Sequence, residues 1–385
     1  MRSPPKPLKG HGAISNPEGR FESRRVRAVD DGWSADREQE PPPLETTVTA
    51  EHARSIITRN DSPDILFAQS INPYRGCGHA CVYCYARPAH SYINLSPGLD
   101  FETKLFYKHN AAELLQQELT RPNYVCKSIT LGANTDPYQP VERNLKVTRS
   151  ILEVLKRFRH PVSIVTKGHL VERDIDILGD MARDNLASVL VSVTTLDPDL
   201  KRKLEPRAPG PGARLHAIRS LRDAGVPVGT LVAPIIPAIN DHEIEHILEA
   251  VAEAGARSAG YVMLRLPYEV KNLFREWLAA HYPLRAAHVM SLINDLRGGR
   301  DNDPNFGSRM RGKGPFAELV RRRFEITCKR LNLNASRYPP LNTQLFSPPL
   351  PGTQATRSGV LSLTAVDRST CDEIGALTDK AVAYY

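Results

Sequence analysis

The sequence lacks the features of secreted, membrane-spanning and disulfide-stapled proteins. It has only six cysteines in 385 residues, and three of them crowd between Cys77 and Cys84, which is not the spacing of a disulfide framework. No apolar run is long enough to cross a bilayer, and the start of the chain has no apolar core of a secretory signal. We therefore expect a cytoplasmic protein with no membrane partner, in which clustered cysteines bind metal or carry out redox chemistry.

Aromatic residues are scarce, whereas prolines number 31, and short runs of consecutive prolines occur near both ends of the chain. Residues 1–60 are polar, charged and Pro-rich, and we predict that they are mostly disordered. Residues 339–385 have a similar composition and are expected to form a loose tail. Between them, hydrophobic residues suffice for a sizeable core, which we assign to residues 61–285, followed by a helical extension over residues 286–338.

Apolar, β-branched runs alternate with helical patterns along this core. The runs of strand length are Ile65–Ile71, Ser128–Leu131, Val162–Thr166, Val189–Thr194, Val226–Val232 and Gly260–Leu264. The helical patterns are Ala111–Leu119, Leu145–Phe158, Val171–Ala182, Arg214–Ala224 and Glu243–Ala254. Six strands that alternate with helices predict an α/β fold with a parallel sheet, either an incomplete barrel or an open doubly wound sheet. In both folds, ligands bind at the carboxyl ends of the strands.

The three clustered cysteines form a C-x3-C-x2-C motif just after the first predicted strand, at Cys77, Cys81 and Cys84. Three thiolates on a short loop can hold three irons of an iron–sulfur cluster, because thiolate is the ligand that such clusters use. No fourth cysteine lies nearby, so one iron would keep an open position. An open position usually marks a catalytic rather than a structural metal site.

Two alternatives compete with an iron–sulfur enzyme. The first is a structural zinc site with His79 or His90 as the fourth ligand, although structural zinc usually pairs two ligand hairpins and the second is absent. The second is a non-enzymatic nucleic-acid-binding protein with a structural metal site. The net charge of +8 and the basic stretch over Arg297–Arg330 favour it. An electron carrier is disfavoured, because carriers usually close all four cluster ligands with protein.

The cysteine motif, with Tyr83 directly before its last cysteine, resembles that of the radical S-adenosylmethionine (SAM) superfamily. The six-fold strand–helix alternation is similar to the partial (β/α)6 TIM-like barrel of that superfamily. Within it, the chain resembles an uncharacterised bacterial group related to spore photoproduct lyase and labelled DNA repair photolyase. The segments that carry this resemblance are Asn72–Cys77, Thr135–Glu142, Thr166–Gly168 and Pro234–Asp241.

The resemblance implies an enzyme that holds a [4Fe-4S] cluster through Cys77, Cys81 and Cys84. SAM would bind the open iron, and one electron from a donor such as flavodoxin or ferredoxin would cleave it to a 5'-deoxyadenosyl radical. Neither the substrate nor a catalytic residue is specified. A nucleic acid is one candidate substrate, and the reaction would be lyase-like or another radical reaction.

Polar residues at the predicted strand ends are candidates for binding SAM beside Tyr83. Acceptors on Asn134, Thr135 and Asp136 would suit the methionyl amino group, although such residues are also routine in tight turns. Lys167 would pair with the methionyl carboxylate, or else be a surface lysine. Ser192 would reach the ribose hydroxyls, although a half-buried strand shows the same polar–apolar alternation.

One feature separates the chain from spore photoproduct lyase. The lyase uses a cysteine near the end of its second strand to return a hydrogen atom to the product radical. The corresponding segment here, Ala133–Asp136, has no cysteine, and Cys126 lies at the opposite end of the strand. Repair of spore photoproduct by that route is therefore not expected, whereas a related radical reaction stays open.

Overall fold

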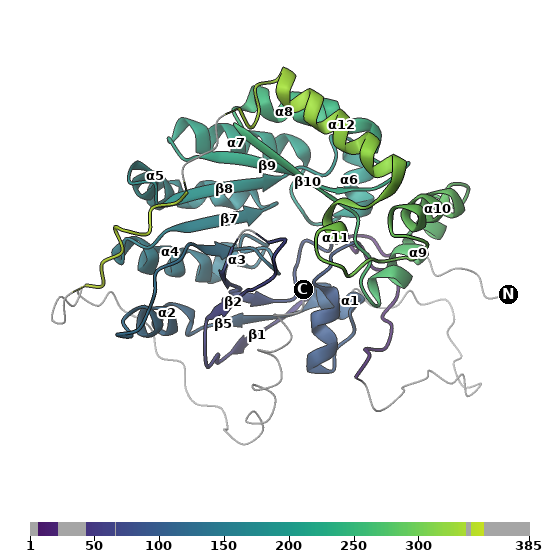
Figure 1. Cartoon of the computed structure of the whole chain (residues 1–385). Coiled ribbons are helices and arrows are strands. Elements are labelled where there is room, and N and C mark those ends of the chain that lie inside the picture. The colour runs from purple at the N-terminus through teal and green to yellow at the C-terminus, as the bar shows by residue number, and fades with distance from the viewer. Residues whose placement is uncertain (1–6, 22–43, 66, 336–339, 350–385) are drawn as a thin grey trace, which may run out of the picture.

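The computed structural model describes residues 7–21, 44–65, 67–335 and 340–349. Its main element is a seven-stranded sheet with the order β10-β9-β8-β7-β6-β3-β2 (Figure 1). Six of these strands are parallel, namely β3 (Gln69–Ile71), β6 (Ile129–Leu131), β7 (Val162–Thr166), β8 (Ala187–Ser192), β9 (Val228–Ile235) and β10 (Ser258–Met263). β2 (Ile57–Arg59) pairs antiparallel with β3 at one edge. Each parallel strand lies beside its predecessor, so the predicted partial barrel is confirmed.

Helices connect successive strands, and the longer ones cover the outer face of the curved sheet (Figure 1). They are α2 (Ala111–Leu119), α3 (Glu142–Leu145), α4 (Val147–Arg157), α5 (Ile175–Arg183), α6 (Pro198–Leu204), α7 (Pro211–Asp223) and α8 (Ile244–Ala254). Their apolar stripes make the core, because residues three and four apart face the sheet. In α4, Ile151, Leu152 and Leu155 are fully buried in one cluster with Ile164 of β7. The predicted helix Leu145–Phe158 is interrupted at Lys146, whose φ is 54°.

A second sheet of three strands, which the sequence analysis did not predict, frames the cysteine motif. β1 (Thr47–Glu51) pairs with β5 (Lys104–Lys108), which in turn pairs with β4 (Tyr74–Arg75). β4 directly precedes the motif. The 3-10 helix η1 (Arg87–Ile93) and α1 (Leu99–Thr103) lead from the motif into β5. The cysteines therefore lie on a connection that is anchored in this sheet at both ends.

Part of the N-terminal segment that composition assigns mostly to disorder packs on the domain. Residues 7–21 and 44–60 belong to the described chain, whereas residues 22–43 lie outside it. Ala13 is fully buried against Leu99 of α1 and Leu273 of α9 (Val270–His281). Figure 1 shows residues 7–21, in purple, beside these two helices.

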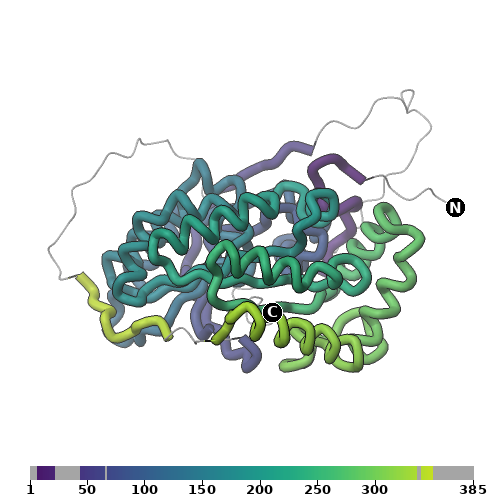
Figure 2. The backbone as a smooth tube through the Cα atoms, turned by 90° about the horizontal axis from the view of Figure 1, so that it is seen from above, coloured from purple at the N-terminus to yellow at the C-terminus, as the bar shows by residue number. Residues whose placement is uncertain are grey.

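Residues 340–349 of the predicted tail cover the N-terminal ends of the strands, and residues 350–385 lie outside the described chain. The Asn342 N–H donates to the Asn185 carbonyl at 2.9 Å, just before β8, and Ser347 N–H donates to the Phe158 carbonyl at 3.0 Å, just before β7. The Phe346 ring lies 5.4 Å from the ring of Tyr124. Figures 1 and 2 show this segment in yellow along that end of the sheet, opposite the carboxyl ends.

The helical extension predicted after residue 285 is present. It comprises α10 (Ala286–Leu296), α11 (Ser308–Arg311) and α12 (Gly314–Arg330). α12 runs along α8, where Arg323 pairs with Glu245 at 2.6 Å. Among the described residues, no helix combines the length and apolarity that crossing a membrane requires.

A bidentate ion pair joins the two edge regions of the main sheet. Arg309 of α11, which packs on β10, donates to both carboxylate oxygens of Asp64 at 2.7 and 2.6 Å. Asp64 belongs to the connection between β2 and β3, at the other edge of the sheet. Both side chains are almost fully buried. Burial alone would raise the pKa of Asp64, but the hydrogen bonds from Arg309 outweigh it and lower that pKa below its ordinary value.

We predict that Asp64→Asn lowers the free energy of unfolding by about 2 kcal/mol, between the effects typical of exposed and of fully buried ion pairs. The loss should be present at neutral pH, because a lowered folded pKa makes the ionised pair stabilising above the ordinary value of 3.8. It should shrink as the pH falls below that value. Urea unfolding of the apoprotein measures it, and the exposed neighbour provides the control variant Asp61→Asn. Equal midpoints for both variants would contradict the assignment.

Candidate functional site

The three thiols of the cysteine motif are close neighbours at the carboxyl end of the sheet. Cys77 and Cys81 are buried and Cys84 is half-buried, and all three are free thiols. Cys84 packs against both the cluster that contains Cys77 and the cluster that contains Cys81. Burial raises the pKa of Cys84 to about 11, and the nearby sulfur of Cys77 adds to this rise. The packing thus places Cys84 beside both buried clusters that contain the other two cysteines, and the role of the three thiols as cluster ligands stays a prediction.

The backbone of the loop is fixed by a close approach and by one side chain. Gly76 has a φ of +74°, and a Cβ there would lie 2.9 Å from the Phe101 carbonyl oxygen, so a larger residue does not fit. Gln139, which is fully buried, accepts from Gly78 N–H at 2.7 Å and donates to the Gly76 carbonyl at 3.2 Å. Gln139 therefore holds the backbone on both sides of Cys77.

Gln139 belongs to the segment after β6, and this segment contacts the cysteine loop repeatedly. The Thr135 hydroxyl donates to the Tyr74 carbonyl at 2.9 Å. The Asn134 N–H donates to the Asn72 side chain at 3.1 Å. Of the predicted SAM-binding residues, Thr135 therefore already has a protein partner, and Asn134 is tied to the loop through its backbone.

Asp136 connects the same segment with the end of β7 and with His79. Its carboxylate accepts from the Thr166 hydroxyl at 2.6 Å and from Lys167 N–H at 2.7 Å. It also lies 3.4 Å from His79 Nδ1. Burial would raise the pKa of Asp136, but His79 and these donors lower it to about 2. Burial would lower the pKa of His79, but Asp136 raises it to about 9, so the two form a buried charged pair.

This arrangement bears on the structural zinc alternative. A zinc site needs four ligand atoms at about 2.0–2.3 Å from one point. Across the described part of the chain, no three His, Cys, Asp or Glu side chains converge in that way. His79 faces Asp136, and His90 Nε2 lies 3.0 Å from the Lys104 carbonyl. Thiolates on separate irons of one bridged cluster do not have to meet at a single point, so this finding concerns a single zinc ion and not a cluster.

Tyr83 contacts a buried ionic network at the end of β8. Its hydroxyl donates to Glu205, which also accepts from the Thr194 hydroxyl at 2.7 Å and pairs with Arg214. Arg214 further donates to the Ser192 carbonyl at 3.1 Å. Burial would raise the pKa of Glu205, but Arg214 and Lys167 lower it to about 2, so the carboxylate is ionised. Glu205 is fully buried.

Lys167 supplies positive charge next to the thiols. Its ammonium lies 5.8 Å from the centre of the Tyr83 ring, and the residue is half-buried. Burial would lower its pKa, but the neighbouring Cys81 and Glu205 outweigh this and raise it. Lys167 is therefore not the surface lysine of the alternative interpretation. Ser192, at the end of β8, is buried as well.

The sequence analysis missed a second buried pair that holds the loop. Arg87 and Glu102 are fully buried and pair with each other. Arg87 also donates to the Cys81 carbonyl at 2.9 Å and to the Gly98 carbonyl at 2.8 Å. Arg87 lies three residues after the last cysteine, but no pattern in the sequence connects it with Glu102.

In the basic C-terminal stretch, which motivated the nucleic-acid-binding alternative, several arginines form ion pairs. Within α12, Arg321 pairs with Glu318 at 2.6 Å and with Glu325 at 2.7 Å. Arg322 also reaches Glu318, and Arg330 reaches Glu249. Paired charges attract phosphates less than free ones, so this stretch gives the alternative little support.

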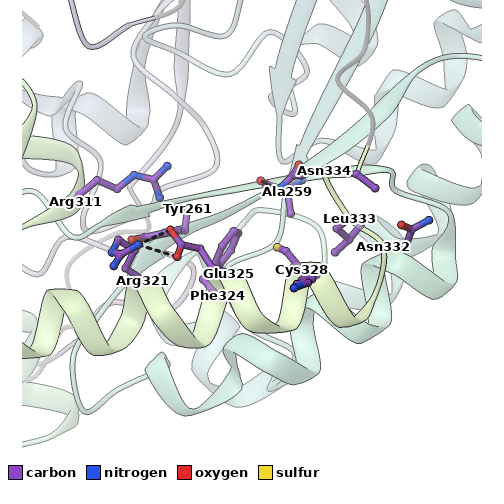
Figure 3. A pocket seen from close by; sticks show the side chains of 12 residues that line it. Ala259, Tyr261, Arg311, Arg321, Phe324, Glu325, Cys328, Asn332, Leu333 and Asn334 are labelled. Carbon is purple, nitrogen blue, oxygen red and sulfur yellow. Dashed lines mark hydrogen bonds and ion pairs between the residues drawn. The ribbon is translucent and has the colours of Figure 1, made fainter.

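A hollow of about 570 Å³ lies between β10 and α12, away from the cysteine loop (Figure 3). Tyr261, Phe324 and Cys328 line it, and Arg311 lies 3.8 Å from the centre of the Tyr261 ring. Figure 3 shows Arg321 turned towards Glu325 at its rim. None of the predicted site residues lines this hollow.

Comparison with known proteins agrees with the arrangement at the strand ends. Residues 71–251 match the family model of the Radical SAM superfamily. An uncharacterised protein of Mycobacterium tuberculosis is 39% identical over 219 residues, which are 56% of this chain and 64% of that protein. The chain thus spans less than two thirds of this relative. An uncharacterised protein of Methanocaldococcus jannaschii is 28% identical over 55% of this chain and 76% of its own length.

A solved structure of a spore photoproduct lyase mutant is similar in fold. It covers 74% of this chain and 79% of its own, with a TM-score of 0.51 and a sequence identity of 15%. At this identity the similarity concerns the fold alone. It agrees with the partial barrel that the strand order defines.

We predict that Glu205→Gln lowers the free energy of unfolding by about 3 kcal/mol, because it leaves Arg214 buried without its carboxylate. Tyr83→Phe removes one hydrogen bond to the same carboxylate and should cost only about 1 kcal/mol. Urea unfolding of the apoprotein tests both, with the exposed Glu113→Gln as the control. A Glu205→Gln midpoint equal to the control would show that the network does not stabilise the fold.

Proposed function

We propose that this protein, whose residues 71–251 match the model of the Radical SAM superfamily, is an enzyme that binds a [4Fe-4S] cluster through Cys77, Cys81 and Cys84. The observation that carries the proposal is the packing of three free thiols beside one another at the carboxyl ends of parallel strands. This is the end at which sheets of this kind bind ligands. A fourth cysteine is absent from the motif, which leaves one cluster position for SAM.

The donor set fits such a cluster. All three donors are sulfur, as iron–sulfur clusters require, and the apolar residues Leu200, Ile236 and Phe101 pack in the same buried clusters as the thiols. When bound, the cluster and SAM supply one-electron cleavage of the sulfonium to a 5'-deoxyadenosyl radical. The chain itself contributes binding, orientation and the exclusion of water.

The segment after β6 has two roles in this proposal. Thr135 and Asp136 act as positioning residues, because their side-chain oxygens are used by the Tyr74 carbonyl, the Thr166 hydroxyl and Lys167 N–H. Asn134, which is half-buried at the same strand end, is the residue that we propose for the methionyl amino group. We therefore propose Thr135 and Asp136 as supports of the site and Asn134 as a SAM ligand.

The remaining candidates surround the thiols from β7, β8 and the loop itself. We propose that Lys167 pairs with the methionyl carboxylate, since it is a half-buried cation beside Cys81. Ser192 is proposed for the ribose hydroxyls. Tyr83 would border the cofactor while its hydroxyl stays on Glu205.

We propose that the substrate is a nucleic acid. A nucleic acid is supported by the net charge of +8 and by the resemblance to the photolyase-like group. The cysteine that the lyase uses for hydrogen return has no counterpart in Ala133–Asp136, so we propose a radical reaction other than spore photoproduct repair. The electron would come from a flavodoxin or ferredoxin in a reducing, cytoplasmic setting. Residues 61–285 are the proposed catalytic domain.

The direct test is the formation of 5'-deoxyadenosine. Protein reconstituted anaerobically with iron and sulfide is given dithionite and SAM, and the product is measured by mass-detected chromatography. We expect product from the wild type and from Cys126→Ala and Cys328→Ala, whose sulfurs lie outside the motif. Cys77→Ala, Cys81→Ala and Cys84→Ala should each lose it together with the cluster absorbance. A full cluster in Cys84→Ala would refute the ligand assignment.

Binding of SAM tests the role of Lys167 separately. We predict that Lys167→Met raises the Kd for SAM about tenfold, because a charge-assisted hydrogen bond is lost. Lys167→Arg should keep most of the affinity, because it keeps the charge. Equilibrium dialysis with reconstituted protein gives the Kd, and the exposed Lys156→Met is the control. If Lys167→Met binds SAM as tightly as the control, another residue holds the carboxylate.

A further inference from the structure

We infer that residues 11–20, here called the strap, are a positioning element that holds the cysteine loop in its closed form. This role rests on the proposed function, because a closed loop matters for the thiols that would carry the cluster. The sequence gives no sign of it, since the strap lies in a Pro-rich segment with the composition of a disordered one. Three sets of contacts support it.

The first set runs through Glu102. The carboxylate of Glu102 accepts from Ala13 N–H at 2.8 Å and from Gly12 N–H at 3.2 Å, and His11 Nδ1 lies 3.2 Å from it. The same carboxylate pairs with Arg87, which donates to the Cys81 carbonyl at 2.9 Å. Two backbone donors of the strap are therefore linked to the backbone of a proposed ligand through a single buried ion pair.

The second contact is direct. Gly12 lies so close to the cysteine loop that a Cβ at this position would be 1.9 Å from the Ala80 carbonyl oxygen and 3.0 Å from the Val82 nitrogen. Ala80 and Val82 flank Cys81 in the chain. Only glycine permits this approach, so any side chain at position 12 must lift the strap or shift the loop.

The third set fixes the rest of the strap to helices on either side. Asn16 and Asp100 of α1 exchange two hydrogen bonds, at 3.1 and 3.0 Å. The Ser15 hydroxyl donates to Glu276 of α9 at 2.6 Å. Arg20 pairs with Glu269, just before α9, at 2.8 Å. These anchors lie at sites distant in sequence, so the strap connects the loop with the helix that follows the barrel.

The loop is thus held from two directions, by Gln139 after β6 and by the strap. Local opening of a loop exposes buried thiols, and its frequency rises when a hold is removed. Weakening the strap should therefore speed chemical modification of Cys77, Cys81 and Cys84. Cys328, buried in α12 at a distant place in the fold, reports global unfolding instead.

The experiment measures alkylation rates in the apoprotein by iodoacetamide, resolved for each cysteine by peptide mass spectrometry. We expect Gly12→Ala to speed modification of the three loop thiols at least tenfold while Cys328 keeps its wild-type rate. The matched control is Gly212→Ala in α7, where nothing lies within 4 Å of the added Cβ, and it should change none of the rates. Loop-thiol rates in Gly12→Ala equal to those of the control would overturn the inference.

A second variant is needed if Gly12→Ala unfolds the protein and raises the alkylation rate of every cysteine alike. Ser15→Ala/Asn16→Ala removes side-chain anchors of the strap without adding bulk, and we expect a severalfold faster modification of the loop thiols alone. Unchanged loop-thiol rates in this double variant would then overturn the inference. In reconstituted protein, the same variant should lose its cluster absorbance to a chelator faster than the wild type.

These readouts separate the strap from the proposed function. Alkylation of the apoprotein needs neither cluster nor SAM. If the strap variants speed alkylation of the loop thiols but the protein never forms 5'-deoxyadenosine, the role of the strap is supported and the proposed enzyme is refuted. If 5'-deoxyadenosine forms normally and both strap variants leave the alkylation rates of the loop thiols unchanged, the proposed enzyme is supported and the role of the strap is refuted.

Discussion

The geometry of the site depends on one buried ion pair, Arg87 with Glu102. Neither charge reaches solvent, and an unpaired charge in such a place costs several kcal/mol, so the two must form together. The remaining N–H groups of Arg87 and the carboxylate oxygens of Glu102 are buried too, so they also need hydrogen-bond partners. Arg87 uses them on the carbonyls of Cys81, Pro97 and Gly98, and Glu102 uses them on the strap. The path of the backbone around Cys81 is therefore set by the partners that these two side chains require.

Most charged and polar residues around the thiols hold other protein groups. Asp136 holds His79 and the end of β7, Glu205 holds Tyr83 and Arg214, and Gln139 holds the loop backbone. Such supporting contacts keep reactive groups in a productive geometry before a ligand arrives, which is the arrangement that efficient sites need. At each strand end, most polar side chains therefore bind other protein groups, and few are available to bind a ligand.

Two features could be predicted from the sequence, namely the alternation of strands and helices and the grouping of the three cysteines. Apolar runs and helical spacing predicted the six parallel strands, because burial on both faces requires such runs. The C-x3-C-x2-C spacing predicted one shared site for three thiols, and Cys84 packs against both buried clusters that contain the other two. The pattern did not reveal the three-stranded sheet, whose strand β4 has only two residues, or the strap, which is held through backbone groups that any sequence offers. Nor could it show that the side chains of Thr135 and Asp136 hydrogen-bond to other parts of the protein. Those hydrogen bonds depend on the Tyr74 carbonyl and the end of β7, which only the folded chain brings near.

The central claim is that three thiols of this loop hold a cluster with one iron open to SAM. Electron paramagnetic resonance of the dithionite-reduced, reconstituted protein tests it most directly, recorded before and after addition of SAM. The account predicts the signal of a reduced [4Fe-4S] cluster whose shape changes when SAM binds to the iron. A cluster signal that SAM leaves unaltered, or a purified protein that binds one zinc ion and no iron, would contradict it.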